Sequence, residues 1–247
     1  MKKLSLLTIL TLLLLSTRSS AADPAATMTR EQAADLLKGI QGEVVSVEPA
    51  EIPGLYQVAL RTQGRVLPLY LDTSGAYLFT GNIIRITDRK NLTEEHFRAL
   101  NPVDLSTIPT DDAIILGNPD AGQKVLVFTD PHCPYCSKLH QVLQQAVAED
   151  SDLAFLIKLI PFKQSSGKIS HTIACSKSLE QLEMAFSGQA LPEPDCETPV
   201  IEENLQLAQS LGITGTPTLI MPNGIIAPGY HSLEDLRGLI HDNPATP

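Results

Sequence analysis

The residues with the clearest chemical potential are two cysteines in a C-x-x-C motif, Cys133 and Cys136. An apolar run over 124–130 precedes them and predicts a buried strand, and a helical pattern over 134–149 follows. The thiolate is the reactive form of cysteine, and the unpaired N–H groups and dipole at the start of a helix stabilise it. Pro134 suits the first helical turn, where its missing N–H would be unpaired anyway. We therefore expect Cys133 to be an exposed nucleophile with a lowered pKa and Cys136 a more buried resolving thiol.

A C-x-x-C motif can also be half of a zinc site or an inert structural disulfide. The chain has four cysteines, which allow three pairings. The other two, Cys175 and Cys196, have 20 residues between them and form no second pair of zinc-ligand spacing. Because the motif lies between a strand and a helix, redox chemistry fits it better. We expect no metal and no organic cofactor.

The second candidate is a proline just before a predicted strand, in the segment Thr214-Gly215-Thr216-Pro217-Thr218. By itself a proline that opens a strand is unremarkable, since it only lacks a donor there. Together with the C-x-x-C motif upstream, the segment predicts a cis Pro217 that faces the two sulfurs. The backbone of Thr216 would then be able to pair with an extended substrate chain, as an added strand does.

Four neighbours of the motif could modify its chemistry. His132 precedes the nucleophile and, when protonated, could stabilise its thiolate, or it could be a rim residue without effect. Asp130 could accept a proton from Cys136, but a polar strand end is the favoured interpretation. We expect Tyr135 to expose one face to substrate, and His140 to be a solvated helix residue rather than a catalyst.

The elements that position these residues follow a βαβ pattern from about residue 112. Ser232, with Asp235 three residues on, is expected to cap the last helix. The sequence predicts strands at 113–116, 124–130, 153–160, 218–221 and 225–227, and helices at 134–149, 168–187, 198–211 and 232–241.

The first half of the chain predicts a small mixed domain. Thr29 is expected to cap a short helix that stops at Gly39, and strands are predicted at 43–47, 56–62, 65–71, 76–79 and 83–87. A linker helix is expected over 91–106, kinked or ended by Pro102. A domain of so few residues buries only a marginal core, and docking to a second copy of the chain would stabilise this domain.

The segment 1–21 has the composition of a secretory leader. Lys2 and Lys3 precede an apolar run over 4–15 that is too short to span a bilayer, and small residues suited to cleavage follow at 19–22. An uncleaved anchor is the alternative. We expect a mature protein without a membrane anchor in an oxidising compartment. The formal net charge of -10 argues against a nucleic-acid-binding surface.

The motifs of the second half resemble the bacterial DsbC/DsbG thiol:disulfide interchange proteins, a thioredoxin-like family. The resemblance rests on 128–130, 133–136, the Leu139-His140 pair and 215–217, and more loosely on the first half of the chain. It implies an α/β protein: a thioredoxin fold with a helical insertion, preceded by a small α+β, cystatin-like dimerisation domain and a linker helix. The expected boundaries are 1–21 for the signal peptide, 22–90 for the dimerisation domain, 91–111 for the linker, 112–247 for the catalytic domain and about 165–211 for the insertion.

The resemblance also implies the roles of the site residues and the partners. Cys133 and Cys136 would be catalytic, while Thr216 and Pro217, with Pro134 and Tyr135 between the cysteines, would contact substrate. The chain would form a homodimer with a cleft for misfolded, disulfide-containing proteins in the periplasm, and a membrane thiol reductase of the DsbD type would keep it reduced. The Pro-Tyr dipeptide is similar to the DsbG version, whereas DsbC usually has Gly-Tyr.

Cys175 and Cys196 lie in the insertion and are expected to form a structural disulfide that stabilises the fold by about 3 kcal/mol. A second redox pair is the alternative for these two. For the whole chain we expect a protein disulfide isomerase or reductase. A disulfide-donating oxidase, a holdase chaperone with secondary thiol activity and a metal-resistance role through the thiols are the competing hypotheses.

Overall fold

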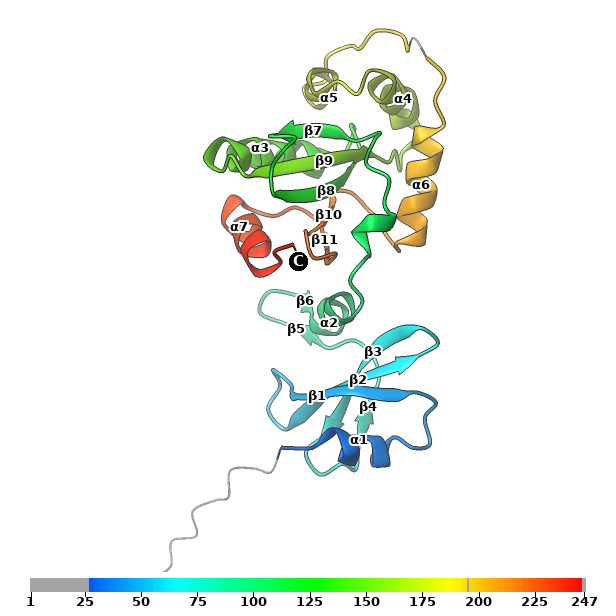
Figure 1. Cartoon of the computed structure of the whole chain (residues 1–247), viewed down its shortest axis with the longest axis vertical. Coiled ribbons are helices and arrows are strands. Elements are labelled where there is room, and N and C mark those ends of the chain that lie inside the picture. Colours follow the sequence, from blue (N-terminus) through cyan, green and yellow to red (C-terminus); the bar gives the residue numbers. More distant parts are fainter. Residues whose placement is uncertain (1–26, 195, 246–247) are drawn as a thin grey trace, which may run out of the picture.

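A computed structural model describes residues 27–194 and 196–245. The chain forms two domains, with helix α2 (Leu92–Leu100) between them (Figure 1). The segment 1–21, where the leader is expected, lies outside the described residues. Among the helices that the structure describes, none is both long and apolar enough to cross a bilayer.

The N-terminal domain packs one short helix on a four-stranded antiparallel sheet. Helix α1 (Arg30–Leu36) begins with a capping box between Thr29 and Gln32, as expected. The sheet has the order β1-β2-β3-β4, and its strands are β1 (Glu43–Pro49), β2 (Leu55–Thr62), β3 (Arg65–Asp72) and β4 (Leu78–Phe79). Its core is small and consists of Ala33, Leu37, Val44, Val58, Leu60, Leu69 and Leu71.

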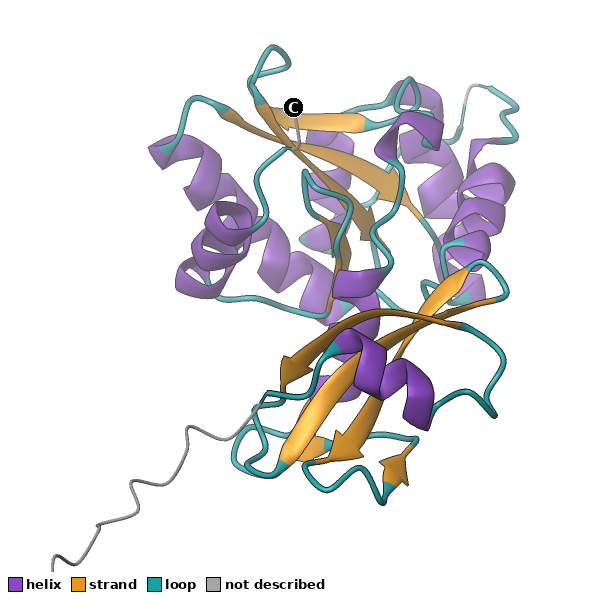
Figure 2. Ribbon diagram, turned by 60° about the horizontal axis from the view of Figure 1, so that its bottom comes forward, coloured by secondary structure: helices purple, strands orange, loops and turns teal. Residues whose placement is uncertain are grey.

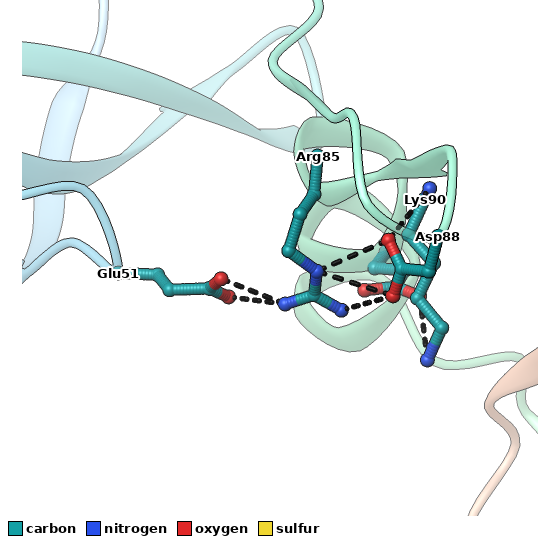
Figure 3. A network of polar contacts seen from close by, with 5 residues as sticks. Glu51, Arg85, Asp88 and Lys90 are labelled. Atoms are coloured by element: carbon teal, nitrogen blue, oxygen red, sulfur yellow. Dashed lines mark hydrogen bonds and ion pairs between the residues drawn. The ribbon is translucent and has the colours of Figure 1, made fainter.

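A two-residue-per-strand hairpin, β5 (Ile84–Arg85) and β6 (Lys90–Asn91), leads into α2. Arg85 ties this hairpin to the preceding sheet, because its guanidinium donates to Glu51 at 2.7 Å and to Asp88 at 2.7 Å (Figure 3). Hydrogen bonds from Arg85 lower the pKa of Asp88 to about 2. The network holds the hairpin at one position beside the β1–β2 connection.

The linker helix is shorter than the predicted 91–106. It ends at Leu100, because Asn101 leaves the helical region and its side-chain amide donates to the carbonyl of Phe97, and Pro102 follows. The same amide donates to the carbonyl of Val66 on β3, at 2.8 Å. The remaining linker contains only a 3₁₀ turn, Leu105–Thr107. Asn101 thus fixes the end of α2 to the N-terminal domain.

The C-terminal domain is built on a five-stranded mixed sheet of order β11-β10-β8-β9-β7. Strands β8 and β9 are parallel, and the other neighbours pair antiparallel. The strands are β7 (Ile114–Gly117), β8 (Gln123–Thr129), β9 (Leu153–Leu159), β10 (Thr218–Ile220) and β11 (Ile226–Pro228). Helix α3 (Pro134–Glu149) connects β8 to β9 with the bounds that the sequence predicts.

Helices cover both faces of this sheet (Figure 2). Alternate residues of β8 separate the two cores: Val125 and Val127 face α3 and α7 (Leu233–Asp242), while Leu126 and Phe128 face α6 (Val200–Ser210). Coverage of both faces fits the composition of these strands: the middle of β8, residues 125–128, is apolar, and β9 is apolar except for Lys158. The linker residues Val103, Leu105 and Ile108 complete the core on the α6 face.

A buried ion pair lies inside the apolar run of β9. The Lys158 side chain is 1% exposed, and its ammonium group donates to the carboxylate of Asp112 and to the carbonyl of Pro109, the latter at 2.9 Å. Both partners belong to the linker that leads into β7. Lys158 therefore fastens the linker to the central sheet.

The insertion departs from the predicted helices in one respect. The single helix expected over 168–187 is two helices, α4 (Gly167–Ser176) and α5 (Leu179–Phe186). Lys177 takes a left-handed conformation with φ of 49°, and the Ser178 hydroxyl accepts the N–H of Gln181 to begin α5. Cys175 at the end of α4 forms a disulfide with Cys196, at a sequence separation of 21, which restrains the chain before α6.

Candidate active site

Cys133 is the N-cap residue of α3, directly after the loop that follows β8, and Pro134 occupies the first helical turn. Cys133 is half-buried, and both cysteines of the motif are free thiols. Partial burial raises the pKa of Cys133, but hydrogen bonds from the Cys136 N–H, the Cys136 thiol and Thr216 lower it by more. The net pKa lies below the ordinary thiol value, so Cys133 is the more readily ionised thiol of the pair.

Cys136 has the opposite environment. Its residue is 1% exposed, one turn into α3, against the β8 end of the sheet. Burial raises the pKa of Cys136 to about 12, although hydrogen bonds from Asp130 and Thr129 act in the opposite direction. The two thiols of one motif therefore differ in accessibility and in acidity.

The sheet brings Pro217 to the motif. Strand β10 pairs antiparallel with β8, with Thr218 opposite Phe128, so the residues before β10 lie beside those after β8. The Thr216–Pro217 peptide bond is cis. The Cys133 thiol donates to the carbonyl of Thr216 at 3.4 Å. Pairing of β10 with β8 thus brings together two residues that are 83 positions apart in the sequence.

Asp130 is buried, and backbone N–H groups donate to both oxygens of its carboxylate. One oxygen accepts the N–H of His132 at 2.8 Å and the other accepts the N–H of Phe162 at 3.0 Å, while the Asp130 N–H donates to the Cys136 sulfur at 3.5 Å. Because both carboxylate oxygens accept backbone N–H groups, the geometry favours a structural role in holding the loop before α3.

The exposed side of the motif carries two rings. His132 is half-buried, with its Nδ1 3.3 Å from the Ser165 hydroxyl, which directs the ring towards the start of the insertion. Tyr135 is 61% exposed, with the Lys138 ammonium 5.6 Å from its ring centroid. Pro134 is exposed as well. The surface beside Cys133 is therefore accessible and partly aromatic.

The interpretation of His140 as a solvated helix residue is wrong. His140 is 6% exposed, and two residues of α5 in the insertion contact its ring. The His140 Nε2 lies 3.2 Å from a Glu183 carboxylate oxygen, and the ring packs 5.2 Å from that of Phe186. The covering residues are more than 40 positions away in sequence, so no local pattern could reveal them.

Sequence reasoning also missed a cleft of about 720 Å³ beside the cis proline. Thr214, Thr216 and Pro217 line one side, while Arg65 of β3 and Arg98 of α2 lie among the residues of the other. The linker residues 102–104 also line this cleft, and the Val103 N–H donates to the carbonyl of Gly224 at 2.8 Å. A Cβ at Gly224 would stand 2.1 Å from the Val103 carbonyl oxygen, so this approach requires glycine.

Comparison with known families assigns both domains. Residues 19–94 match the disulfide bond isomerase protein N-terminal domain, and residues 111–243 match the thioredoxin-like domain. A probable thiol:disulfide interchange protein DsbC of Bordetella parapertussis is 30% identical over 212 residues, which cover 83% of this chain and 71% of the relative. The chain belongs to the DsbC family of thiol:disulfide interchange proteins. Its fold is the expected thioredoxin-like one with an N-terminal DsbC domain.

Two further proteins are similar to this chain. The thiol:disulfide interchange protein DsbC of Escherichia coli K12 is 25% identical over 206 residues, 80% of this chain and 81% of the relative. The crystal structure of a disulfide interchange protein from Neisseria gonorrhoeae matches with a TM-score of 0.49 and 25% identity, over 56% of this chain and 100% of that one. As a member of the DsbC family, the protein is a thiol:disulfide oxidoreductase with disulfide isomerase activity.

Proposed function

We propose that this DsbC-family protein reshuffles non-native disulfides of secreted proteins in the periplasm through its Cys-Pro-Tyr-Cys dithiol. The observation that carries the proposal is the contrast between the two thiols. Cys133 is accessible at the start of a helix with a lowered pKa, and Cys136 is buried beneath it with a pKa raised to about 12. An attacking thiol works best when its pKa is near the ambient pH, and a buried second thiol does not compete for the same substrate.

The reaction begins when the Cys133 thiolate attacks one sulfur of a wrong disulfide, which forms a mixed disulfide and releases the other substrate sulfur as a thiolate. If that or another substrate thiol attacks the mixed disulfide, the substrate leaves isomerised and Cys133 is regenerated. If Cys136 attacks Cys133 instead, the substrate leaves reduced and the protein is oxidised. In both outcomes the electrons pass only between thiols and disulfides, so neither outcome requires a cofactor.

The substrate class follows from the surface around Cys133. The carbonyl of Thr216 lies beside the nucleophile, at the edge of the cis-proline loop, where an extended chain can pair with the backbone. Tyr135 and Pro134 are exposed beside it. An unfolded or misfolded segment can meet these requirements, whereas a disulfide buried in a compact domain cannot reach the half-buried sulfur.

The compartment and partners are part of the proposal. The leader-like segment 1–21 supports export to the periplasm. An isomerase must stay reduced there, which supports a membrane thiol reductase of the DsbD type as electron donor. The small core of the N-terminal domain and its family assignment support a homodimer.

Scrambled ribonuclease in a glutathione buffer tests the proposed function. We expect catalytic amounts of the reduced protein to accelerate recovery of ribonuclease activity well beyond glutathione alone. A parallel redox titration against glutathione distinguishes an isomerase, which is substantially reduced under these conditions, from a disulfide-donating oxidase. No acceleration over the buffer would contradict the proposal, and full rescue by a Cys133→Ala variant would indicate a holdase chaperone instead.

A further inference from the structure

One buried titratable side chain near the sulfurs has no part in the mechanism above. His140 lies four residues after Cys136 on α3, so both side chains occupy the same face of the helix. They line one cavity of about 10 Å³, together with Val127, Thr129 and three apolar residues of α3 and β9. A space of this size is close to the minimum for one water molecule. His140 and Cys136 thus border the same small cavity.

The surroundings of His140 fix its ring and its tautomer. The Glu183 carboxylate oxygen that lies 3.2 Å from Nε2 also accepts the side-chain amide of Gln144 at 2.8 Å. A carboxylate only accepts, so Nε2 carries the hydrogen in the neutral ring and Nδ1 is the basic nitrogen. Burial lowers the pKa of His140 below its ordinary value, although Glu183 acts in the opposite direction. The ring is therefore neutral, and able to accept a proton, at neutral pH.

Cys136 needs such an acceptor. Its thiol must lose a proton before the sulfur can attack the mixed disulfide, and burial raises its pKa to about 12. The carboxylate of Asp130 is engaged by two backbone N–H groups. The titratable groups that face the His140 ring are Cys136 on its own helix and Glu183 on α5.

We propose that His140 accepts the proton of Cys136 during the resolving step, with Glu183 as the residue that positions the ring and stabilises the imidazolium. In this step the S–H bond of Cys136 breaks and an N–H bond forms on His140, with one water molecule in the shared cavity relaying the proton. The thiolate then attacks Cys133, the Cys133–Cys136 disulfide forms, and the bond from Cys133 to the substrate sulfur breaks. The substrate leaves as a thiolate with the electron pair of that bond, and His140 returns its proton to solvent or to this thiolate. The inference rests on the proposed roles of the two cysteines.

A two-phase reaction with 5,5′-dithiobis(2-nitrobenzoate) separates the two sulfurs. Attack by Cys133 on the reagent releases one coloured thiolate and leaves a mixed disulfide. Attack by Cys136 on that mixed disulfide releases the second coloured thiolate. Stopped-flow absorbance of the reduced full-length protein therefore reports Cys133 in the first phase and Cys136 in the second, and Cys136→Ser removes the second phase.

We expect His140→Gln to slow the second phase by about 10²-fold and to leave the first phase unchanged, since general bases contribute on this order. A glutamine amide can still donate to Glu183 but cannot accept a proton. Glu183→Gln should slow the second phase by a smaller factor, because the imidazolium loses its carboxylate. His241→Gln is the matched control, since that ring is 89% exposed on α7, and it should leave both phases unchanged.

The pH profile distinguishes proton transfer from packing. In the unmodified protein the second-phase rate should rise as His140 deprotonates and then level off. In His140→Gln it should keep rising tenfold per pH unit, because the reaction then depends on direct ionisation of Cys136. An unchanged second phase in His140→Gln, or a variant profile that levels off in the same way, would overturn the inference. A slow first phase in the unmodified protein would contradict the proposed role of Cys133 itself, so the two failures are distinguishable.

Discussion

We expect a Cys133→Ser variant to lose both reductase and isomerase activity, down to the rate of the glutathione buffer alone. A serine hydroxyl does not ionise near neutral pH and cannot form a mixed disulfide, so no residual attack is available at the start of α3. Insulin reduction and recovery of scrambled ribonuclease measure the two activities. No other substitution in the chain should have a larger effect on catalysis.

Cys136→Ser is the matched control for this variant. Its nucleophile and the contact between Cys133 and Thr216 are intact. The variant should therefore accumulate a mixed disulfide with substrate, visible on non-reducing gels, and should lose reductase activity while retaining part of its isomerase activity. Accumulation of a mixed disulfide on Cys136 in the Cys133→Ser variant would show that the two thiols have been assigned in the wrong order.

The largest effect on stability is expected at the ion pair that fastens the linker to the sheet. Asp112→Ala should lower the free energy of unfolding of the C-terminal domain by about 3–5 kcal/mol, because it leaves the Lys158 ammonium buried without its carboxylate. Urea unfolding followed by circular dichroism measures this difference as a shift of the midpoint at constant slope.

Two further variants show whether burial causes the effect. The double variant Asp112→Asn, Lys158→Met should be less destabilised than Asp112→Ala, since no uncompensated charge is left inside the domain. Glu193→Ala removes an exposed ion pair, in which the Glu193 side chain is 79% and the Lys168 side chain 69% accessible. This variant should leave the midpoint of unfolding almost unchanged. Equal midpoint shifts for Asp112→Ala and Glu193→Ala would contradict the assigned role of the buried pair.

Local signals made part of this structure predictable. The apolar run of β8, the proline in the first turn of α3 and the serine cap of α7 depend on neighbours within a few residues, and the elements formed where expected. The cis proline was predictable because the C-x-x-C motif gave the segment before β10 a partner. Neighbouring residues therefore place both cysteines, whereas the cis-proline loop is recognised only together with the distant motif.

Features that depend on distant chain segments were not predictable. His140 is buried by residues of the sheet and by Glu183 and Phe186 of α5, all distant in sequence. Lys158 interrupts an apolar strand without any local partner, since Asp112 lies 46 residues earlier. The break at Lys177 requires a left-handed residue that no glycine marks. The cleft beside Pro217 is lined by residues of both domains and of the linker, so no single segment of the sequence indicates it.

The acidity of Cys133 relative to Cys136 is the central claim, and alkylation of the reduced protein by iodoacetamide across a pH series tests it most directly. Mass spectrometry identifies the modified residue, and the rate reports the thiolate fraction. The rate should rise with pH to a plateau whose midpoint lies below the ordinary thiol pKa, with the label confined to Cys133. A midpoint at the ordinary value, or a label that appears first on Cys136, would contradict the account.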